Sequence, residues 1–239
     1  MGAIAIEFFG VTKQGRRKRN EDAFLAENLG PFFLFAVADG IGGHAAGDVA
    51  SRLAVSTLRE TAVQGASLLD PAPILRRAFS LANASILSYN RSHGLNAGTT
   101  LTAVIVDRSG HCTMGTIGDS RAYIISGGDT WHTKNHSYVQ ALVDRGMISE
   151  EEAFHHPQKN IVEKALGLHE TASPDIYEKE VKGATLVLST DGMHDTLREG
   201  EIAEIATRLS PRDAAVRLAS EALRRESMDN ITAVVVRVG

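Results

Sequence analysis

The chain has 239 residues, of which 43% are hydrophobic and 23% charged. This is the composition of an ordinary globular domain, so a disordered, collagenous or coiled-coil protein is excluded, and the length suits one large domain. The 25 Lys and Arg residues against 29 Asp and Glu residues give a net charge of −4, which provides no general attraction to nucleic acid or anionic lipid.

The lack of a targeting pattern in residues 1–10 and the low cysteine content lead us to expect a cytoplasmic protein. Residues 1–10 show no basic stretch followed by an apolar one, and the longest apolar run, 32–38, is too short to span a membrane. The single cysteine, Cys112, cannot form an internal disulfide, which suits a reducing compartment. We expect a monomer that contacts neither membrane nor nucleic acid.

The first half of the chain predicts strands followed by two amphipathic helices. Apolar residues at helical spacing run from 46 to 57, and Asp70-Pro71 begins a second helix that Gly94 ends. Each helix has one apolar stripe and therefore needs a sheet to pack against. Strands are expected at 3–9, 23–26 and 32–38, the last one buried on both faces.

The second half predicts more strands, a polar segment and a closing helix and strand. Strands at 100–106, 112–117 and 122–125 are joined by short turns and are expected to form an antiparallel meander. Residues 133–157 are polar, with short helical pieces, and are expected to form a surface flap. Capping residues mark one flap helix, at Ser149 to Glu152, and a later helix that starts at Ser210. Two further strands are expected, at 185–189 and 232–238.

Four carboxylates stand at or beside the ends of the expected strands. They are Asp39, Asp119, Asp191 and Asp229, and Glu21 and Asp22 come just before the second strand. A carboxylate held against a sheet is costly to desolvate unless a cation or hydrogen bonds compensate it. Asp-Gly pairs such as Asp39-Gly40, taken singly, are more often plain turns, but the joint pattern predicts a metal site.

The ligand types narrow the choice of metal. Carboxylate oxygens without a cysteine partner suit Mg²⁺ or Mn²⁺ better than Zn²⁺, and none of the nine histidines falls in a zinc-binding spacing. Two such ions about 3.5 to 4 Å apart can lower the pKa of a bridging water and polarise a phosphoryl group for in-line attack. The expected chemistry is hydrolysis of a phosphate ester without a covalent intermediate.

A dinucleotide site is the competing interpretation of one segment. Residues 40–45 fit G-x-G-x-x-A between a strand and a helix, and Glu60 follows about twenty residues later. However, Asp39 would repel a pyrophosphate, Glu60 continues a helical pattern, and no strand-helix-strand unit follows. We therefore expect no dinucleotide here.

Eight short motifs follow one another along the chain. They are RKRNED (17–22), DGIGGH (39–44), GTT (98–100), GDSR (118–121), HS (136–137), HP (156–157), STDG (189–192) and DNIT (229–232). With these motifs in this order, the chain resembles the metal-dependent protein phosphatases of type 2C, the PPM family in its compact bacterial form, over nearly its whole length. The resemblance implies an α+β fold, with two stacked antiparallel sheets flanked by helix pairs, in one catalytic domain over residues 1–239 with the flap at 133–157.

The resemblance also implies the ligands of two core ions, Mn²⁺ or Mg²⁺. Asp39 would bridge both ions and act as a catalytic residue, and Gly40 would add its backbone carbonyl. Asp191 and Asp229 would complete the shell of the first ion. A hydroxide that bridges the two ions would attack the phosphate.

Other residues correspond to more weakly held metal positions. Glu21 or Asp22 would hold the second ion, largely through water, and the resemblance does not decide between them. Asp119 matches the ligand of a third, weaker ion beside the flap. Relatives often carry an aspartate before the HS motif, where this chain has Asn135, so a contribution of the flap to that third site stays open.

Arg17 matches the arginine that binds the substrate phosphate, and its planar guanidinium suits a phosphoryl group. It is the second catalytic residue that the resemblance implies. The other basic residues of this motif, Arg16, Lys18 and Arg19, are expected to form a solvated turn. His44 could be a general acid, but a loop-packing histidine, or a metal-bound water acting as the acid, is the alternative.

The residues predict a metal-dependent hydrolase of phosphate esters, and the resemblance implies that its substrates are phosphoserine and phosphothreonine in proteins, so that it opposes a serine/threonine kinase. The same site could serve a metal-dependent phosphohydrolase of small phosphorylated metabolites. A non-catalytic regulatory domain of this fold is a third possibility. Such a domain would be expected to have lost metal ligands, and here all of them are present.

Overall fold

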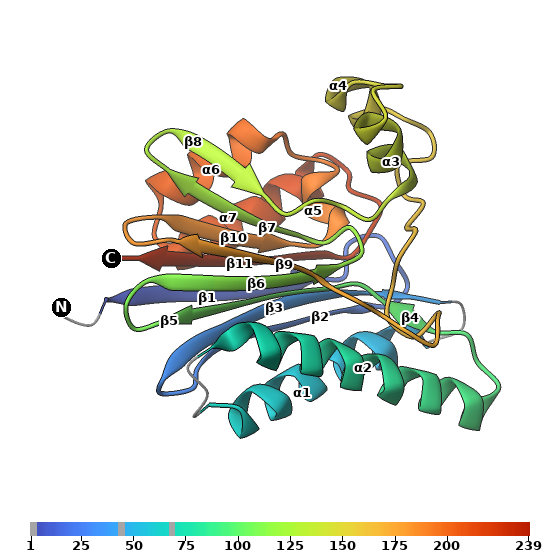
Figure 1. Cartoon of the computed structure of the whole chain (residues 1–239). Helices are drawn as coiled ribbons and strands as arrows, with labels where there is room; N and C mark the ends of the chain where they lie inside the picture. The colour runs from blue at the N-terminus through green and yellow to red at the C-terminus, as the bar shows by residue number, and fades with distance from the viewer. Residues whose placement is uncertain (1–3, 43–45, 67–69) are drawn as a thin grey trace.

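The computed structural model describes residues 4–42, 46–66 and 70–239, and in it two antiparallel sheets stack face to face (Figure 1). The first sheet has the order β1 (Ile6–Lys13), β11 (Ile231–Val238), β10 (Thr185–Ser189), β7 (Arg121–Ser126) and β8 (Asp129–His132). The second has the order β2 (Asp22–Asn28), β3 (Phe32–Ile41), β5 (Leu101–Asp107), β6 (His111–Ile117) and β9 (Asp175–Glu180), with β4 (Gly98–Thr99) paired to β3.

Strand β3 shows why the two sheets stack. Phe33, Phe35 and Val37 point to the first sheet and join a core with residues of β10 and β11. The alternate residues Leu34 and Ala36 join the core under the helices on the other side. The strand is thus buried on both faces, as its continuous apolar sequence predicted.

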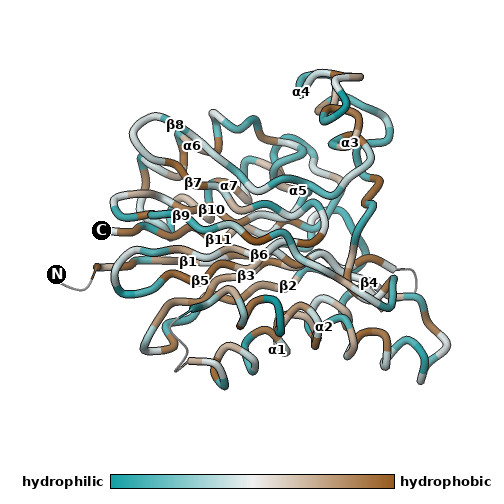
Figure 2. The backbone as a smooth tube through the Cα atoms, viewed as in Figure 1, coloured by the Kyte–Doolittle hydropathy of each residue, from teal (hydrophilic) through white to brown (hydrophobic). Residues whose placement is uncertain are grey.

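Helix pairs cover the outer faces of both sheets (Figure 1). Helices α1 (Gly47–Gln64) and α2 (Pro71–His93) pack on the second sheet, while α6 (Glu199–Arg208) and α7 (Pro211–Arg224) pack on the first. Hydrophobic segments run through the strands between these layers (Figure 2). The predicted sandwich is confirmed. None of the helices in the described ranges combines the length and apolar character that crossing a bilayer requires.

The predicted helix ends agree with the structure. Asp70 accepts a hydrogen bond from the backbone N–H of Ala72 at 2.9 Å, and Gly94 ends α2 in the left-handed conformation. Ser210 accepts one from the N–H of Asp213 at the start of α7. Each cap satisfies a backbone group that the helix itself leaves unpaired.

The segment after β8 leaves the sheets and carries α3 (Tyr138–Asp144) and α4 (Glu150–Phe154), which stand apart from the sandwich in Figure 1. The capping box of Ser149 and Glu152 is present. Two ion pairs connect this flap region to the C-terminal half: Arg198 with Glu151 at 2.7 Å and Lys159 with Asp195 at 3.0 Å.

The predicted meander is wrong. Strands β5 and β6 form a hairpin in the second sheet, but β7 pairs with β10 and β8 in the first. The chain crosses between the sheets at 118–120, where Gly118 has a φ of 102° and a Cβ would lie 2.5 Å from Thr100. Period-two alternation marks a strand but does not say which of two sheets it joins.

Candidate metal and phosphate site

One cavity of about 300 Å³ gathers most of the predicted site residues at one end of the sandwich. We call it the acidic cavity. Its lining includes Arg17, Glu21, Asp39, Gly40, Asp119, Asp191 and Asp229. Residues more than 200 positions apart in sequence therefore meet there, and of the predicted set only Asp22 lies outside the lining.

Asp39 and Gly40 belong to strand β3, whereas the sequence placed them after it. The backbone N–H of Asp39 donates to Thr100 Oγ1 at 2.8 Å, and the N–H of Thr100 donates to the Asp39 carbonyl at 2.9 Å. A Cβ at Gly40 would lie 2.3 Å from the carbonyl oxygen of Gly47, so helix α1 approaches too closely for any other residue. The alternative of a plain Asp-Gly turn is excluded.

Asp191 and Asp229 are brought together by a second close approach of backbones. Asp191 is the first residue of α5 (Asp191–His194), directly after β10, and Asp229 comes shortly before β11. A Cβ at Gly192 would lie 2.0 Å from the carbonyl oxygen of Asn230. Asp191 Oδ1 is buried and has no hydrogen-bond partner in the described part of the chain, which leaves it available to a cation.

Glu21 and Asp22 face different surroundings. Glu21 lines the acidic cavity, and its carbonyl accepts a hydrogen bond from the N–H of Gly40 at 3.1 Å. Asp22 is not among the lining residues, and its Oδ2 accepts from Thr190 Oγ1 at 2.8 Å and Thr232 Oγ1 at 2.6 Å, while its Oδ1 is buried without a hydrogen-bond partner in the described part of the chain. Burial raises the pKa of Asp22 to about 7. Of the two carboxylates, the geometry favours Glu21 as the one that faces a bound ion.

Burial and mutual repulsion dominate the electrostatics of the cavity. Burial, followed by the charge of Asp191, raises the pKa of Asp39 well above its ordinary value. Burial, followed by the charge of Asp119, does the same to the pKa of Asp191. Burial and the charge of Asp195 raise the pKa of Asp119 to about 6. Each shift opposes ionisation, so the ionised cluster needs compensating positive charge.

The donor set fits hard divalent cations. Carboxylate oxygens and one backbone carbonyl are the ligands that Mg²⁺ and Mn²⁺ prefer. Asp191 Oδ1, which has no hydrogen-bond partner in the described part of the chain, is suited to bind such an ion. Within the described residues, no three acidic or histidine side chains are already spaced to hold one ion.

Arg17 lies at the mouth of the acidic cavity. Its Nη2 donates to Asp229 Oδ2 at 2.6 Å, and this hydrogen bond raises the pKa of the guanidinium. The side chain is 57% exposed, so the group can reach an incoming anion. Lys18 and Arg19 are exposed, as expected of a solvated turn, but Arg16 is an ion-pair partner of Glu226 at 2.8 Å.

Three other sequence hypotheses have different outcomes. His44 lies outside the described residues, so the choice between a general acid and the favoured alternatives, a loop-packing histidine or a metal-bound water as the acid, is not tested. Asn135 accepts a hydrogen bond from Arg121 Nε at 2.8 Å and lines a neighbouring cavity together with Asp119, so a contribution of the flap to a third ion stays open. The dinucleotide alternative is excluded, because β3 has only antiparallel neighbours among the described strands and Glu60 lies inside α1.

Sequence reasoning missed residues that position the site. The side-chain amide of Asn230 donates to the carbonyls of Gln14 and Arg19, at 2.7 and 2.8 Å. Its Oδ1 accepts from the N–H of Glu21 at 2.8 Å. Asp48 was missed as well, although its charge adds to burial in raising the pKa of Glu21. The position of Asn230 in the DNIT motif was the available signal.

Comparison with known proteins gives the family. A family model described as protein phosphatase 2C matches residues 9–230. The serine/threonine protein phosphatase PstP of Mycobacterium tuberculosis is 37% identical over 227 residues, which cover 93% of this chain and 43% of that protein. The serine/threonine phosphatase stp of Listeria welshimeri is 35% identical over 235 residues, which cover 94% of this chain and 93% of that protein.

A solved structure agrees with the fold as well. The catalytic domain of PstP in complex with two manganese ions has a TM-score of 0.88 to this chain at 32% identity, covering 98% of this chain and 99% of that one. This chain belongs to the protein phosphatase 2C family, as its motifs predicted. It spans less than half the length of the Mycobacterium tuberculosis relative and nearly all of the Listeria relative.

Proposed function

We propose that the chain is a metal-dependent phosphatase that hydrolyses phosphoserine and phosphothreonine in proteins. The acidic cavity with Arg17 at its mouth carries this proposal, because it combines a ligand set for hard cations with a group that binds phosphate. The names of the Mycobacterium and Listeria relatives support the same activity.

Each residue has a role that follows from its position. Asp39, Gly40, Asp191 and Asp229 would hold two divalent cations, with Glu21 on the side of the second. When bound, these ions supply Lewis acidity, which lowers the pKa of a water molecule and polarises the phosphoryl group. Arg17 donates charge-assisted hydrogen bonds to the phosphate and orients the ester for in-line attack.

The surroundings of the cavity favour a polypeptide substrate over a small metabolite. A flap cavity of about 350 Å³, beside α4, shares Asp119 with the acidic cavity. An outer cavity of about 440 Å³, beside residues 225–229, shares Arg17 and Asp191 with it. These neighbouring cavities offer room for residues on both sides of a phosphorylated side chain.

Several finer points belong to the same proposal. The two core ions are Mn²⁺ or Mg²⁺, in line with the two manganese ions of the PstP structure, and a third, weaker ion binds beside Asp119. The chain acts as a monomeric catalytic domain over residues 1–239, with the flap at 133–157, and opposes a serine/threonine kinase. Its one cysteine, Cys112, is buried and free, which is compatible with the cytoplasm.

Phosphate release from phosphothreonine and phosphoserine peptides tests the proposal. We expect turnover with Mn²⁺ or Mg²⁺ and none with a chelator. A panel of phosphorylated sugars and nucleotides, at equal concentration, should give kcat/KM values at least about 100-fold lower. Faster turnover of a metabolite than of every peptide would support the small-molecule alternative, and metal binding without any turnover would support a regulatory domain.

A further inference from the structure

Helix α7 ends in an unusual residue. Glu226 has a φ of 63° and is the only residue other than glycine with a positive φ in the described part of the chain. The N–H of Ser227 donates to the Ala222 carbonyl and the N–H of Glu226 to the Leu223 carbonyl, both at 3.0 Å. This is the Schellman motif, in which glycine is the usual residue because a Cβ strains the left-handed conformation.

The side chain of Glu226 has one ion-pair partner, Arg16, at 2.8 Å. Arg16 Nη1 also contacts the sulfur of Met228 at 3.8 Å. The next residue, Arg17, binds Asp229. Two consecutive arginines therefore hold the two ends of one four-residue loop, 226–229.

The turn that carries these arginines is fitted closely to the same loop. Gly15 has a φ of 62°, and a Cβ there would lie 2.1 Å from the carbonyl oxygen of Asp229. The amide of Asn230 bridges the carbonyls of Gln14 and Arg19. The placement of Arg17 thus depends on how the turn 14–19 sits on the loop 226–229.

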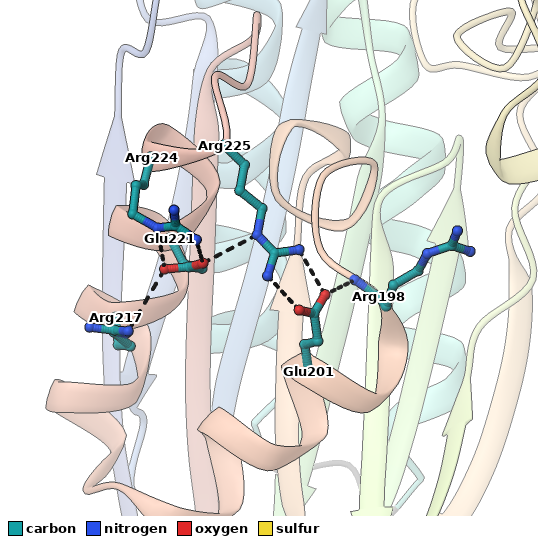
Figure 3. Close-up of polar contacts among 6 residues, drawn as sticks. All are labelled: Arg198, Glu201, Arg217, Glu221, Arg224 and Arg225. Atoms are coloured by element: carbon teal, nitrogen blue, oxygen red, sulfur yellow. Dashed lines mark hydrogen bonds and ion pairs between the residues drawn. The ribbon is translucent and has the colours of Figure 1, made fainter.

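The far side of the loop is anchored to the body of the protein. Arg225, directly before Glu226, binds Glu201 of α6 and Glu221 of α7, in a network that also includes Arg224 (Figure 3). Ser227 Oγ donates to the Gly192 carbonyl at 2.8 Å, beside Asp191. Residues 225 and 227 are thus anchored on either side of Glu226. The ion pair between Glu226 and Arg16 therefore helps to fix where the turn 14–19 lies.

We propose that Arg16 and Glu226 are positioning residues, which hold the turn 14–19 so that Arg17 faces the substrate phosphate. The inference rests on the proposed function and adds a specific role for two residues that touch neither metal nor phosphate. It also explains why a strained glutamate stands where glycine would suit the backbone better. Strain of this kind persists where a function maintains it.

Glu226→Gly separates positioning from folding. Glycine suits the left-handed conformation, so the melting temperature should stay level or rise, whereas loss of the contact with Arg16 should impair phosphate binding. We expect about a three- to fivefold rise in KM for a phosphothreonine peptide, the scale of an exposed ion pair, with kcat within about twofold. The dissociation constant for inorganic phosphate, measured by calorimetry with Mn²⁺, should rise by a similar factor.

Matched variants complete the test. Arg16→Ala should reproduce the effect, and the double variant should be no worse than either single one, because both remove the same contact. Arg208→Ala, which breaks an equally exposed Arg–Glu pair on α6, should change neither constant.

Unchanged KM and phosphate affinity in Glu226→Gly would overturn the proposal. A rise in KM that occurs only together with a fall in melting temperature would also overturn it, because such a result indicates that the pair stabilises the fold and does not position Arg17. If the parent chain releases no phosphate from any peptide, the proposed function fails, and the phosphate affinities still decide the role of the pair.

Discussion

Asp22 and Asp39 lie directly opposite each other on β2 and β3, yet only Asp39 reaches the acidic cavity. Asp22 instead receives hydrogen bonds from Thr190, after β10, and Thr232, on β11, so it connects the second sheet to the first. We therefore expect Asp39 to serve metal binding and Asp22 to serve the structure that surrounds the site. The difference leads to opposite expectations for their variants.

Asp39→Asn should abolish activity and stabilise the metal-free protein. The variant removes the carboxylate expected to contact both ions, so kcat should fall by at least about 1,000-fold, as a loss of several kcal/mol implies. It also removes a buried charge that burial and Asp191 disfavour. With chelator present, the melting temperature should rise by about 2 to 4 °C, the shift that 1 kcal/mol gives at this size. Activity near that of the parent would contradict the assignment.

Asp22 variants should separate structure from metal binding. Asp22→Asn keeps an oxygen for both threonine hydroxyls and should retain the fold and both core ions. Asp22→Ala leaves the buried Thr190 hydroxyl without its acceptor, at a cost of about 1 to 3 kcal/mol, whereas the Thr232 hydroxyl can still donate to Thr12 Oγ1 at 2.8 Å. Glu21→Gln is the comparison, and we expect it to weaken the second binding event in a calorimetric Mn²⁺ titration. Loss of that event in Asp22→Asn, with Glu21→Gln normal, would reverse the two roles.

Asp119→Ala should slow turnover while both core ions stay bound. Asp119 follows β6 and lines the flap cavity as well as the acidic cavity, so it stands at the edge of the ligand set. The rate should lose its dependence on millimolar Mn²⁺, and calorimetry should still detect two tight sites. A variant that binds fewer than two ions tightly would place Asp119 in the core of the site. Asn135→Asp is expected to strengthen the weak site by adding a carboxylate.

The sequence predicted which residues gather at the acidic cavity better than it predicted the strand pairing that brings them together. Apolar runs ending in Asp39 or Asp191 marked the acidic residues, because each follows or completes a buried strand. The strand β9 was missed, since its charged residues, such as Glu178 and Glu180, are exposed at the edge of the sheet and break the apolar pattern. The crossing at Gly118 was also missed, because it depends on packing against Thr100, which local sequence does not encode.

Arg17→Ala should weaken phosphate handling and leave the metals in place. Loss of a charge-assisted hydrogen bond, about 1.5 to 3 kcal/mol, predicts a fall of about 10- to 150-fold in kcat/KM. Arg17→Lys should recover part of this, since a point charge cannot make a bidentate contact. Arg19→Ala is the control, and its effect should stay within a few fold and diminish with salt. A larger fall in kcat/KM for Arg19→Ala than for Arg17→Ala would show that this motif is aligned out of register with its relatives.

Glu221 should make the C-terminal end of α7 sensitive to acid, because its ion-pair partners Arg217, Arg224 and Arg225 all belong to that helix or to its C-cap. Hydrogen bonds from Arg224, and then from Arg225, lower the pKa of Glu221 from 4.5 to about 2 (Figure 3). Because the folded-state pKa lies below the unfolded one, its stabilisation is complete above about pH 4.5 and is lost as the pH falls towards 2.

Thermal unfolding of Glu221→Gln between pH 7 and pH 2 tests this expectation. The amide cannot ionise, so the variant should be less stable than the parent at pH 5 to 7, and the two melting curves should converge near pH 2. Glu163→Gln, at an exposed position without an ion pair among the described residues, should follow the parent throughout. Parallel curves for Glu221→Gln and the parent would mean that the ion pairs of Glu221 add no pH-dependent stability to α7.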